Sequence, residues 1–327
     1  MERIFTGMRK FIEGNPGLKY IFFMGKGGVG KTVMAATAAL WSARGGRRTL
    51  LVSTNPAHSL SSLFGQDVFG KPAAVCNEEQ CHAFEIDTHD TIERSKQQIR
   101  DKIAWFLKSA GITTKAEDFI ESATMNPALE ESAMFENMID LVFRDEYDLY
   151  VFDTAPFASA RRLLGMWKVN SLWVEKMLKS REEAKSLREA LSFSRKQQDD
   201  PLMDYLTGLQ ERMAKAEKLL ADKALTAFFF VTLPESLPIA VTARFIDWSS
   251  GLGMPVGGVI VNGVMQKGEI NERTAEFVRN RIATQDEHMA KIRSLFGERV
   301  RAVTPLFETE VKGSAMLERM GTYLFAQ

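Results

Sequence analysis

The chain has 327 residues, of which 45% are hydrophobic and 26% are charged, and its 42 basic and 42 acidic side chains cancel. This composition is typical of a folded protein and excludes extensive disorder, and the balanced charge excludes a general attraction to nucleic acid or anionic membranes. Two cysteines, Cys76 and Cys81, are too few for a secreted disulfide scaffold. Residues 1–10 lack the apolar stretch of a signal peptide, and the longest apolar run, at 227–231, is too short to span a bilayer. We therefore expect a cytoplasmic protein.

Short apolar runs alternate with longer helical patterns along the chain. Runs that are apolar on both faces and are separated by helices are typical of a parallel sheet covered on both sides. We therefore predict an α/β fold with a doubly wound, mainly parallel sheet. The predicted strands are residues 20–24, 49–53, 83–86, 149–153, 227–232 and 256–261, with a weaker candidate at 300–303.

Residues 101–145 and 165–223 interrupt this alternation, because their pattern is helical and carries no strand signal. Apolar residues at alternating spacings of four and three run from 173 to 191 and again from 202 to 220. This spacing predicts two helices with one apolar seam each, joined as an antiparallel hairpin, and Asp200-Pro201 is a typical start for the second helix. We expect a single domain over 1–327, with these segments as a helical subdomain inserted in the α/β core.

The strongest motif is Gly25-Lys-Gly-Gly-Val-Gly-Lys-Thr32, which fits the pattern G-x-x-x-x-G-K-[ST] throughout. It follows a predicted strand and opens a predicted helix over 33–40, as a phosphate-binding P-loop requires. A chance glycine-rich turn is the alternative. In a P-loop, backbone N–H groups and the helix N-terminus surround phosphate oxygens, Lys31 reaches the β- and γ-phosphates, and the Thr32 hydroxyl binds Mg²⁺. The expected nucleotide-binding residues here are Gly25, Gly27, Gly28, Val29, Gly30, Lys31, Thr32 and Val33.

Asp153 ends the predicted strand at 149–153. An aspartate at the carboxyl end of a strand, beside a P-loop, suits a ligand that holds Mg²⁺ through water. The alternative interpretation is an ordinary turn residue at the end of a strand. With the P-loop, Asp153 predicts a site for ATP and Mg²⁺.

With these motifs, the chain resembles the family of the arsenical pump-driving ATPase (ArsA) and the ATPase that targets tail-anchored membrane proteins. This family belongs to the SIMIBI class of P-loop proteins with a deviant Walker A motif. The likeness spans roughly residues 18–320. Besides the P-loop, it is carried by residues 53–60, 153–156, 234–237, 261–262 and 305–313.

The resemblance implies roles for residues outside the core of the P-loop motif. Lys26 resembles the extra lysine that reaches the nucleotide of a partner subunit, and Glu235 resembles a residue that contacts this lysine. Asn262 resembles the asparagine that reads the adenine edge, a task for which an amide is suited because it donates and accepts hydrogen bonds at once. Pro305 begins the family's adenine-side loop. Residues 53–60 resemble the first switch, and residues from Asp153 onward resemble the second.

The chain departs from the family pattern in both switches. The first switch of the family reads Asp-Pro-Ala-His, with an aspartate that positions the attacking water, whereas this chain carries Asn55. Loss of a general base typically costs about 10²–10⁴ in rate, but an amide can still orient water. We therefore predict slow hydrolysis, with Lys26, Lys31 and Asn55 as catalytic residues. In the second switch, Phe157-Ala-Ser-Ala160 replaces the family's Thr-Gly-His-Thr, which predicts altered coupling to the helical subdomain.

The sequence thus predicts a Mg²⁺- and ATP-dependent dimer whose nucleotide state rearranges the helical subdomain, to handle an apolar client or to drive a membrane-protein partner. The alternative prediction is a slow or inactive ATP-binding regulatory or scaffold subunit that pairs with an active paralogue. The sequence is therefore compatible with a homodimer and with a heterodimer. No nucleic-acid partner is expected. The pattern Cys76-x₄-Cys81-His82 is too loose for a zinc site, and the helical segments carry no cysteines for arsenite.

Overall fold

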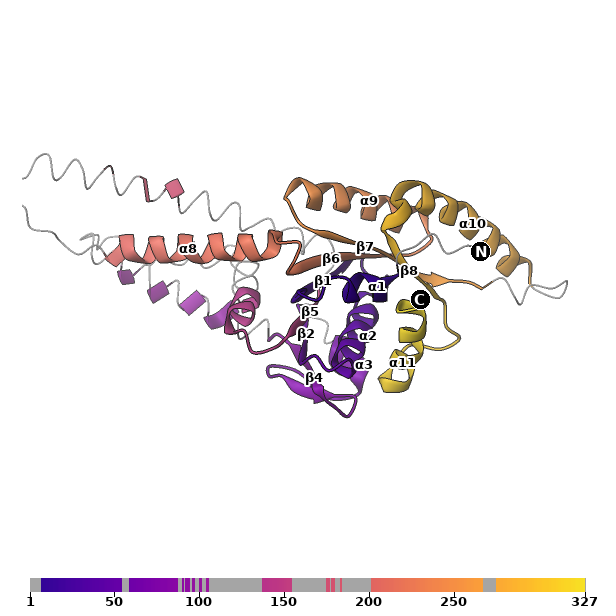
Figure 1. Ribbon diagram of the computed structural model, residues 1–327, viewed down its shortest axis with the longest axis horizontal. Helices are drawn as coiled ribbons and strands as arrows, with labels where there is room; N and C mark the ends of the chain where they lie inside the picture. The colour runs from indigo at the N-terminus through magenta and orange to yellow at the C-terminus, as the bar shows by residue number, and fades with distance from the viewer. Residues whose placement is uncertain are drawn as a thin grey trace, which may run out of the picture. The chain divides into compact units, whose positions relative to one another are not determined.

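The computed structural model describes residues 7–54, 59–87, 137–154, 201–266 and 275–326, together with scattered helical residues between 90 and 105 and between 175 and 183 (Figure 1). The chain divides into two compact units. The core unit comprises Met1–Thr88, Arg144–Ala160 and Leu220–Gln327, and the helical unit comprises His89–Phe143 and Arg161–Leu219. The subdomain boundaries expected from the sequence stay a prediction, because most of the residues concerned lie outside the described part.

The core unit contains an eight-stranded sheet with the strand order β3-β4-β2-β5-β1-β6-β7-β8. Every neighbouring pair is parallel except β3 and β4 at one edge. The α/β fold with a mainly parallel sheet is therefore confirmed. The strands are β1 (Tyr20–Gly25), β2 (Thr49–Ser53), β3 (Ala73–Val75), β4 (Glu78–Glu85), β5 (Leu149–Asp153), β6 (Thr226–Thr232), β7 (Val256–Val264) and β8 (Val300–Pro305).

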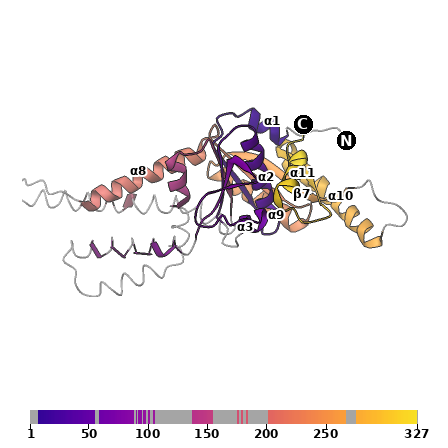
Figure 2. The same cartoon turned by 90° about the horizontal axis from the view of Figure 1, so that it is seen from below.

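Helices cover both faces of the sheet, as a doubly wound fold requires. On one face, α2 and α11 pack side by side, as both views show (Figures 1 and 2). On the other face, α9 packs against β6 and β7, and α10 packs against α9. No described helix is long and apolar enough to cross a membrane. The helices are α1 (Met8–Glu13), α2 (Lys31–Arg44), α3 (Ser59–Phe64), α8 (Pro201–Ala221), α9 (Ser236–Gly251), α10 (Glu276–Phe296) and α11 (Gly313–Leu324), with a 3₁₀ turn η2 (Gly297–Arg299).

The apolar strand runs form this sheet because their side chains are buried on both faces. Every residue of β1, β2, β5 and β6 is buried. Alternate side chains point to opposite faces; thus Phe23 joins the core beneath α2, whereas Phe22 stacks on Phe152 and Phe228 with ring centroids 4.6 and 4.7 Å apart. The prediction missed β3, a three-residue edge strand whose residues are mostly not buried. It also began β4 several residues too late.

The second helix of the predicted hairpin is confirmed as α8, which begins at Pro201. Asp200, the expected cap, lies outside the described residues. So does most of the first helix, in which only 175–176, 178–179 and 183 are described, all as helix. The antiparallel pairing of the two helices therefore stays a prediction.

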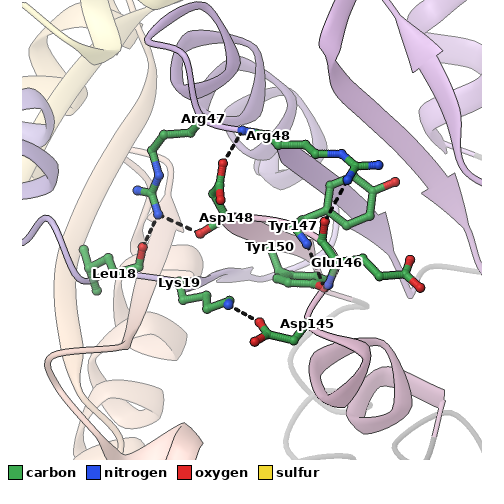
Figure 3. Close-up of polar contacts among 9 residues, drawn as sticks. All are labelled: Leu18, Lys19, Arg47, Arg48, Asp145, Glu146, Tyr147, Asp148 and Tyr150. Atoms are coloured by element: carbon green, nitrogen blue, oxygen red, sulfur yellow. Dashed lines mark hydrogen bonds and ion pairs between the residues drawn. The ribbon is translucent and has the colours of Figure 1, made fainter.

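Two consecutive arginines join the amino ends of β1, β2 and β5 (Figure 3). The Arg47 guanidinium donates to the Leu18 carbonyl and, over 2.9 Å, to the Asp148 carbonyl. The Arg48 backbone N–H donates to Asp148 Oδ2 over 2.9 Å. These bonds hold the start of β5 in register with its neighbours.

The segment that leads into β5 is held by a tyrosine (Figure 3). The Tyr150 hydroxyl accepts the backbone N–H groups of Glu146 and Tyr147 over 2.9 and 3.3 Å. Lys19 forms an ion pair with Asp145, whose φ of 57° lies in the left-handed region. Since β5 ends at Asp153, this network at its amino end positions the strand that carries the expected metal ligand.

Candidate functional site

The loop from β1 to α2 has a backbone that requires glycine. Gly30 has a φ of 93°, and a Cβ there would lie 2.3 Å from Asn262 Nδ2. At Gly25, a Cβ would lie 2.6 Å from the Val231 carbonyl oxygen and 2.7 Å from Val29 Cγ2. Both glycines therefore let the loop pack tightly against neighbouring strands. The N-terminus of α2 follows this loop directly, in the position where a phosphate group would bind.

Lys31 is the first residue of α2, and its side chain is only 7% exposed. Its ammonium group donates to the Lys26 carbonyl oxygen over 3.3 Å, so the side chain lies back along the loop. Burial lowers the pKa of Lys31, and the nearby Asp153 carboxylate opposes this effect. A bound anion would restore the charge-stabilising contacts that burial removes.

Thr32 and Asp153 meet beside the loop, as the sequence predicts for a metal site. The Thr32 hydroxyl donates to Asp153 Oδ2 over 2.7 Å, and the Ser53 hydroxyl donates to the same oxygen over 3.4 Å. Asp153 is 1% exposed. Burial raises its pKa to about 6, while the hydrogen bond from Thr32 and the charge of Lys31 lower it.

The second carboxylate oxygen of Asp153 tests whether the site fits Mg²⁺. Oδ1 is buried and makes no hydrogen bond of good geometry to any described residue, although the nearby Ser59 hydroxyl helps to lower the pKa of the carboxyl group. A buried acceptor of this kind normally has a partner. A hydroxyl and a carboxylate are the hard oxygen ligands that Mg²⁺ prefers, and this ion usually keeps several waters that need acceptors. The residues present fit the hydrated ion.

A cavity of 420 Å³ opens beside the loop and collects residues that are distant in sequence. Its walls include the expected nucleotide-binding residues Gly28, Thr32, Val33, Asn262 and Pro305. Asn262 and Pro305 lie near the carboxyl ends of β7 and β8, and the other three follow β1 in the loop and the first turn of α2. Ligands of open α/β sheets bind at such ends. The structure thus places the expected base-binding residues next to the expected phosphate-binding loop.

Asn262, which lines this cavity, is hydrogen-bonded at both ends of its amide. Its Nδ2 donates to the Val29 carbonyl oxygen over 2.9 Å, and its Oδ1 accepts the Thr304 hydroxyl over 2.8 Å. The amide therefore retains one N–H and one oxygen lone pair for a ligand. Sequence reasoning missed Thr304, because nothing in the pattern of β8 distinguishes this threonine from an ordinary strand residue.

The loop that follows β8 is held against α11 through Phe307, which also lines the cavity. The Phe307 ring lies edge-on to Tyr323 with centroids 5.8 Å apart, and the Arg319 guanidinium lies 4.6 Å from its centroid. Arg319 also forms an ion pair with Glu308. Aromatic and cation–π contacts of this type stabilise a defined loop position, so this wall of the cavity is preformed.

A buried carboxylate, which sequence reasoning also missed, holds α3, whose first residues end the segment expected to be the first switch. Glu85 on β4 is buried, and its two oxygens accept the Leu60 backbone N–H and the Ser61 hydroxyl, each over 2.6 Å. The signal that could have found it is a charged residue inside the apolar run 83–86. Residues 55–58, with the predicted catalytic Asn55, and residues 155–160 of the expected second switch lie outside the described residues.

The resemblance implies that Lys26 reaches the nucleotide of a partner subunit and that Glu235 contacts this lysine. Lys26 is half-buried on the loop, and Glu235 is exposed at the start of α9. Within one chain, the Glu235 carboxylate accepts Arg281 of α10 over 3.2 Å. Arg281 therefore orients Glu235, and the contact between Glu235 and Lys26 stays a prediction.

Both cysteines are free thiols. Burial raises the pKa of Cys81 to about 12 and also raises that of Cys76. Thiolate, and not thiol, is the form that binds metals. Among the described residues, no group of three or more His, Cys, Asp or Glu side chains is arranged to hold a metal ion.

Comparison with known proteins identifies the family of the chain. Residues 18–326 match the family model of the anion-transporting ATPases, ArsA_ATPase. The chain is 27% identical over 310 residues to "ATPase ASNA1 homolog 2" of Paramecium tetraurelia, covering 93% of this chain and 92% of that protein. It is 29% identical over 315 residues to "ATPase get3" of Sclerotinia sclerotiorum, covering 94% and 89% of the two chains.

A further relative, "Putative arsenical pump-driving ATPase" of Halobacterium salinarum, is 29% identical over 321 residues. These residues are 98% of this chain but only 46% of that protein. The family match covers nearly the whole chain, including the P-loop, Asp153, Asn262 and Pro305. By this match and by its fold, the chain belongs to the anion-transporting ATPase (ArsA) family.

Proposed function

We propose that the chain is a slow, Mg²⁺-dependent ATPase that works as a dimer. ATP binding and hydrolysis rearrange the helical segments 101–145 and 165–223, which handle an apolar client or drive a membrane-protein partner. The observation that carries this proposal is the meeting of Lys31, Thr32 and the incompletely bonded Asp153 beside a cavity that also contains Asn262. Relatives named as get3 and as an arsenical pump-driving ATPase support the two kinds of output.

Each residue of the proposed site has a defined task. Backbone N–H groups of residues 25–30 and the N-terminus of α2 bind the phosphate oxygens, and the Lys31 ammonium binds the β- and γ-phosphates. Thr32 holds Mg²⁺ directly and Asp153 holds it through water. When bound, Mg²⁺ neutralises charge on the transferring phosphoryl group. Asn262 and Pro305 bind the base, and Asn55 orients the attacking water.

Asn55 sets the rate in this proposal. Since an amide orients water but accepts no proton, we expect the purified chain to hydrolyse ATP slowly in single-turnover assays, and Asn55→Asp to be at least about tenfold faster. Quenched-flow or filter assays with excess enzyme, ATP and Mg²⁺ measure both rates. Equal rates for the parent and Asn55→Asp would contradict the assignment of Asn55.

The second candidate function is an ATP-binding regulatory or scaffold subunit. It is favoured by the presence of Asn55 where the family carries an aspartate. It predicts tight ATP binding with no hydrolysis by the parent or by Asn55→Asp. Equilibrium binding, measured beside the kinetics, separates this case from a protein that does not bind ATP at all. Hydrolysis by a mixture with an active paralogue would then identify the partner subunit.

Lys26 gives a test of the proposed dimer. If the Lys26 ammonium binds the partner's phosphates, Lys26→Ala should weaken ATP-dependent dimerisation about tenfold or more, because a charge-assisted hydrogen bond is lost. Sedimentation velocity with a non-hydrolysable ATP analogue measures the effect, and nucleotide binding by one subunit should largely survive. Lys71→Ala, at an exposed lysine, is the matched control. Unchanged dimerisation of Lys26→Ala would count against this role.

A further inference from the structure

Thr304 is a fully buried hydroxyl residue near the end of β8. Its Oγ1 donates to Asn262 Oδ1 on the neighbouring strand β7 over 2.8 Å. Thr304 does not line the cavity, whereas Asn262 does. Thr304 can therefore act on a ligand only through the Asn262 amide.

The nitrogen end of the same amide is bound by a group that can only accept a hydrogen bond. Asn262 Nδ2 donates to the Val29 carbonyl oxygen over 2.9 Å, and a carbonyl oxygen only accepts. Reversing the amide would place Oδ1 against this carbonyl, so that two acceptors would face each other. Gly30 approaches so closely that a Cβ there would lie 2.3 Å from Nδ2, which leaves the amide little room to move. The Val29 carbonyl thus sets which end of the amide faces it, and the Thr304 hydroxyl, which can donate or accept, holds the other end in place.

In this orientation the amide retains one N–H and one lone pair for a ligand. Adenine offers a matching pair, because N7 accepts and the N6 amino group donates, and asparagine binds it through both. Guanine offers two acceptors, N7 and O6, so Oδ1 would face an acceptor. An amide held at both ends therefore distinguishes the two bases through Oδ1, whereas an amide held by Val29 alone can tilt Oδ1 away from N6 or O6 and distinguishes them less.

We propose that Thr304 is a positioning residue that makes the nucleotide site selective for adenine over guanine by locking the Asn262 amide. The inference rests on the proposed function, since it requires a nucleotide in the cavity. Thr304 makes no contact with the nucleotide and takes no part in phosphoryl transfer. Its effect is on the choice of base.

The test compares affinities of the full-length chain for ATP and GTP, measured with Mg²⁺ by competition against a fluorescent ATP analogue. Thr304→Val keeps the shape of the side chain and removes the donor, and it should lower the ratio of Kd for GTP to Kd for ATP about tenfold. Thr304→Ser keeps the hydroxyl and should retain the parent ratio. Loss of folded protein would weaken the binding of both nucleotides equally and leave the ratio of the two Kd values unchanged. A change in the ratio therefore reports a change in how the Asn262 amide is held.

Thr49→Val is the matched control. Thr49 is a fully buried strand residue whose hydroxyl donates to the Arg47 carbonyl oxygen over 2.9 Å at the opposite end of the sheet. The Thr49→Val variant should lose a comparable hydrogen bond and keep the parent's ratio of Kd for GTP to Kd for ATP. Thermal unfolding without nucleotide establishes that each variant is folded. If Thr304→Val does not fold, Thr304→Ala and Thr304→Cys are compared by the same ratio.

The outcomes separate this inference from the proposed function. A parent that binds neither ATP nor GTP refutes the proposed function, and the role of Thr304 with it. A parent that prefers ATP, with a folded Thr304→Val variant of the same preference, overturns the role of Thr304 alone. A reduced preference that serine restores and that Thr49→Val does not reproduce is the result expected.

Discussion

Replacing Lys31 by alanine is expected to lower single-turnover ATP hydrolysis by about 10³-fold or more. Lys31 is 7% exposed, and its ammonium lies along the loop with the Lys26 carbonyl oxygen 3.3 Å away. In such a water-excluded position, a charge acts strongly on the phosphoryl oxygens and needs no rearrangement during the reaction. The truncated side chain leaves these oxygens without a cation from the P-loop.

The measurement is the first-order rate with enzyme in excess over ATP, with nucleotide affinity determined separately. Lys10→Ala, which removes an exposed lysine on α1, should keep the parent rate. Since the parent is itself expected to be slow, Lys31→Ala is also tested in the Asn55→Asp background, where a large loss is easily measured. A rate within threefold of the parent would show that Lys31 does not bind the reacting phosphate.

Asp153→Asn is expected to remove Mg²⁺-dependent hydrolysis, with a loss on the order of 10²–10³-fold. Asp153 Oδ2 accepts the Thr32 hydroxyl over 2.7 Å, and Oδ1 is the acceptor proposed for a metal-bound water. An asparagine keeps the bond to Thr32 but presents an amino group or a neutral oxygen to the water. Rates measured over a Mg²⁺ titration test this, with Asp247→Asn, at an exposed residue of α9, as the control. Parent-like Mg²⁺ dependence of Asp153→Asn would contradict the assignment.

The same substitution should stabilise the protein when Mg²⁺ and nucleotide are absent. Burial raises the pKa of Asp153 from 3.8 to about 6. Between these values the folded state holds a proton that the unfolded state has released, so this group lowers the free energy of unfolding as pH rises. Above the pKa of Asp153 in the folded state, the loss of stability caused by this buried carboxylate has its full value. Because asparagine carries no charge, the free energy of unfolding of Asp153→Asn should exceed that of the parent at pH 8 by on the order of 2–3 kcal/mol.

Denaturant unfolding at several pH values checks this sign. The difference between Asp153→Asn and the parent should shrink as pH falls below about 6 and vanish below the ordinary pKa of aspartate. In the parent, the apparent Mg²⁺ affinity should also fall as pH drops through about 6, because a proton competes for the carboxylate. A variant that is less stable than the parent at pH 8 would show that burial does not penalise this carboxylate.

The parts of the site that could be predicted from the sequence are built from consecutive residues. A strand, a glycine-rich turn and a helix follow each other at residues 20–44, so the motif sets its own geometry locally. The parallel sheet was predictable because β1, β2, β5 and β6 are apolar on both faces, which only burial between two helical layers accommodates. Asp153 was predictable because it ends one of these strands.

The contacts of these residues depend on how the whole chain folds. Asn262 lies 233 positions from Val29, yet the two are hydrogen-bonded. No periodicity encodes that contact, because it results from the order in which β1, β6, β7 and β8 assemble. Thr304 became recognisable only as a buried polar group with a partner on another strand, and the partners of Glu85 on α3 were likewise visible only in the folded chain. A polar group that folding removes from water must find a partner in the packed chain, and packing, which depends on all the elements together, determines which partner it finds.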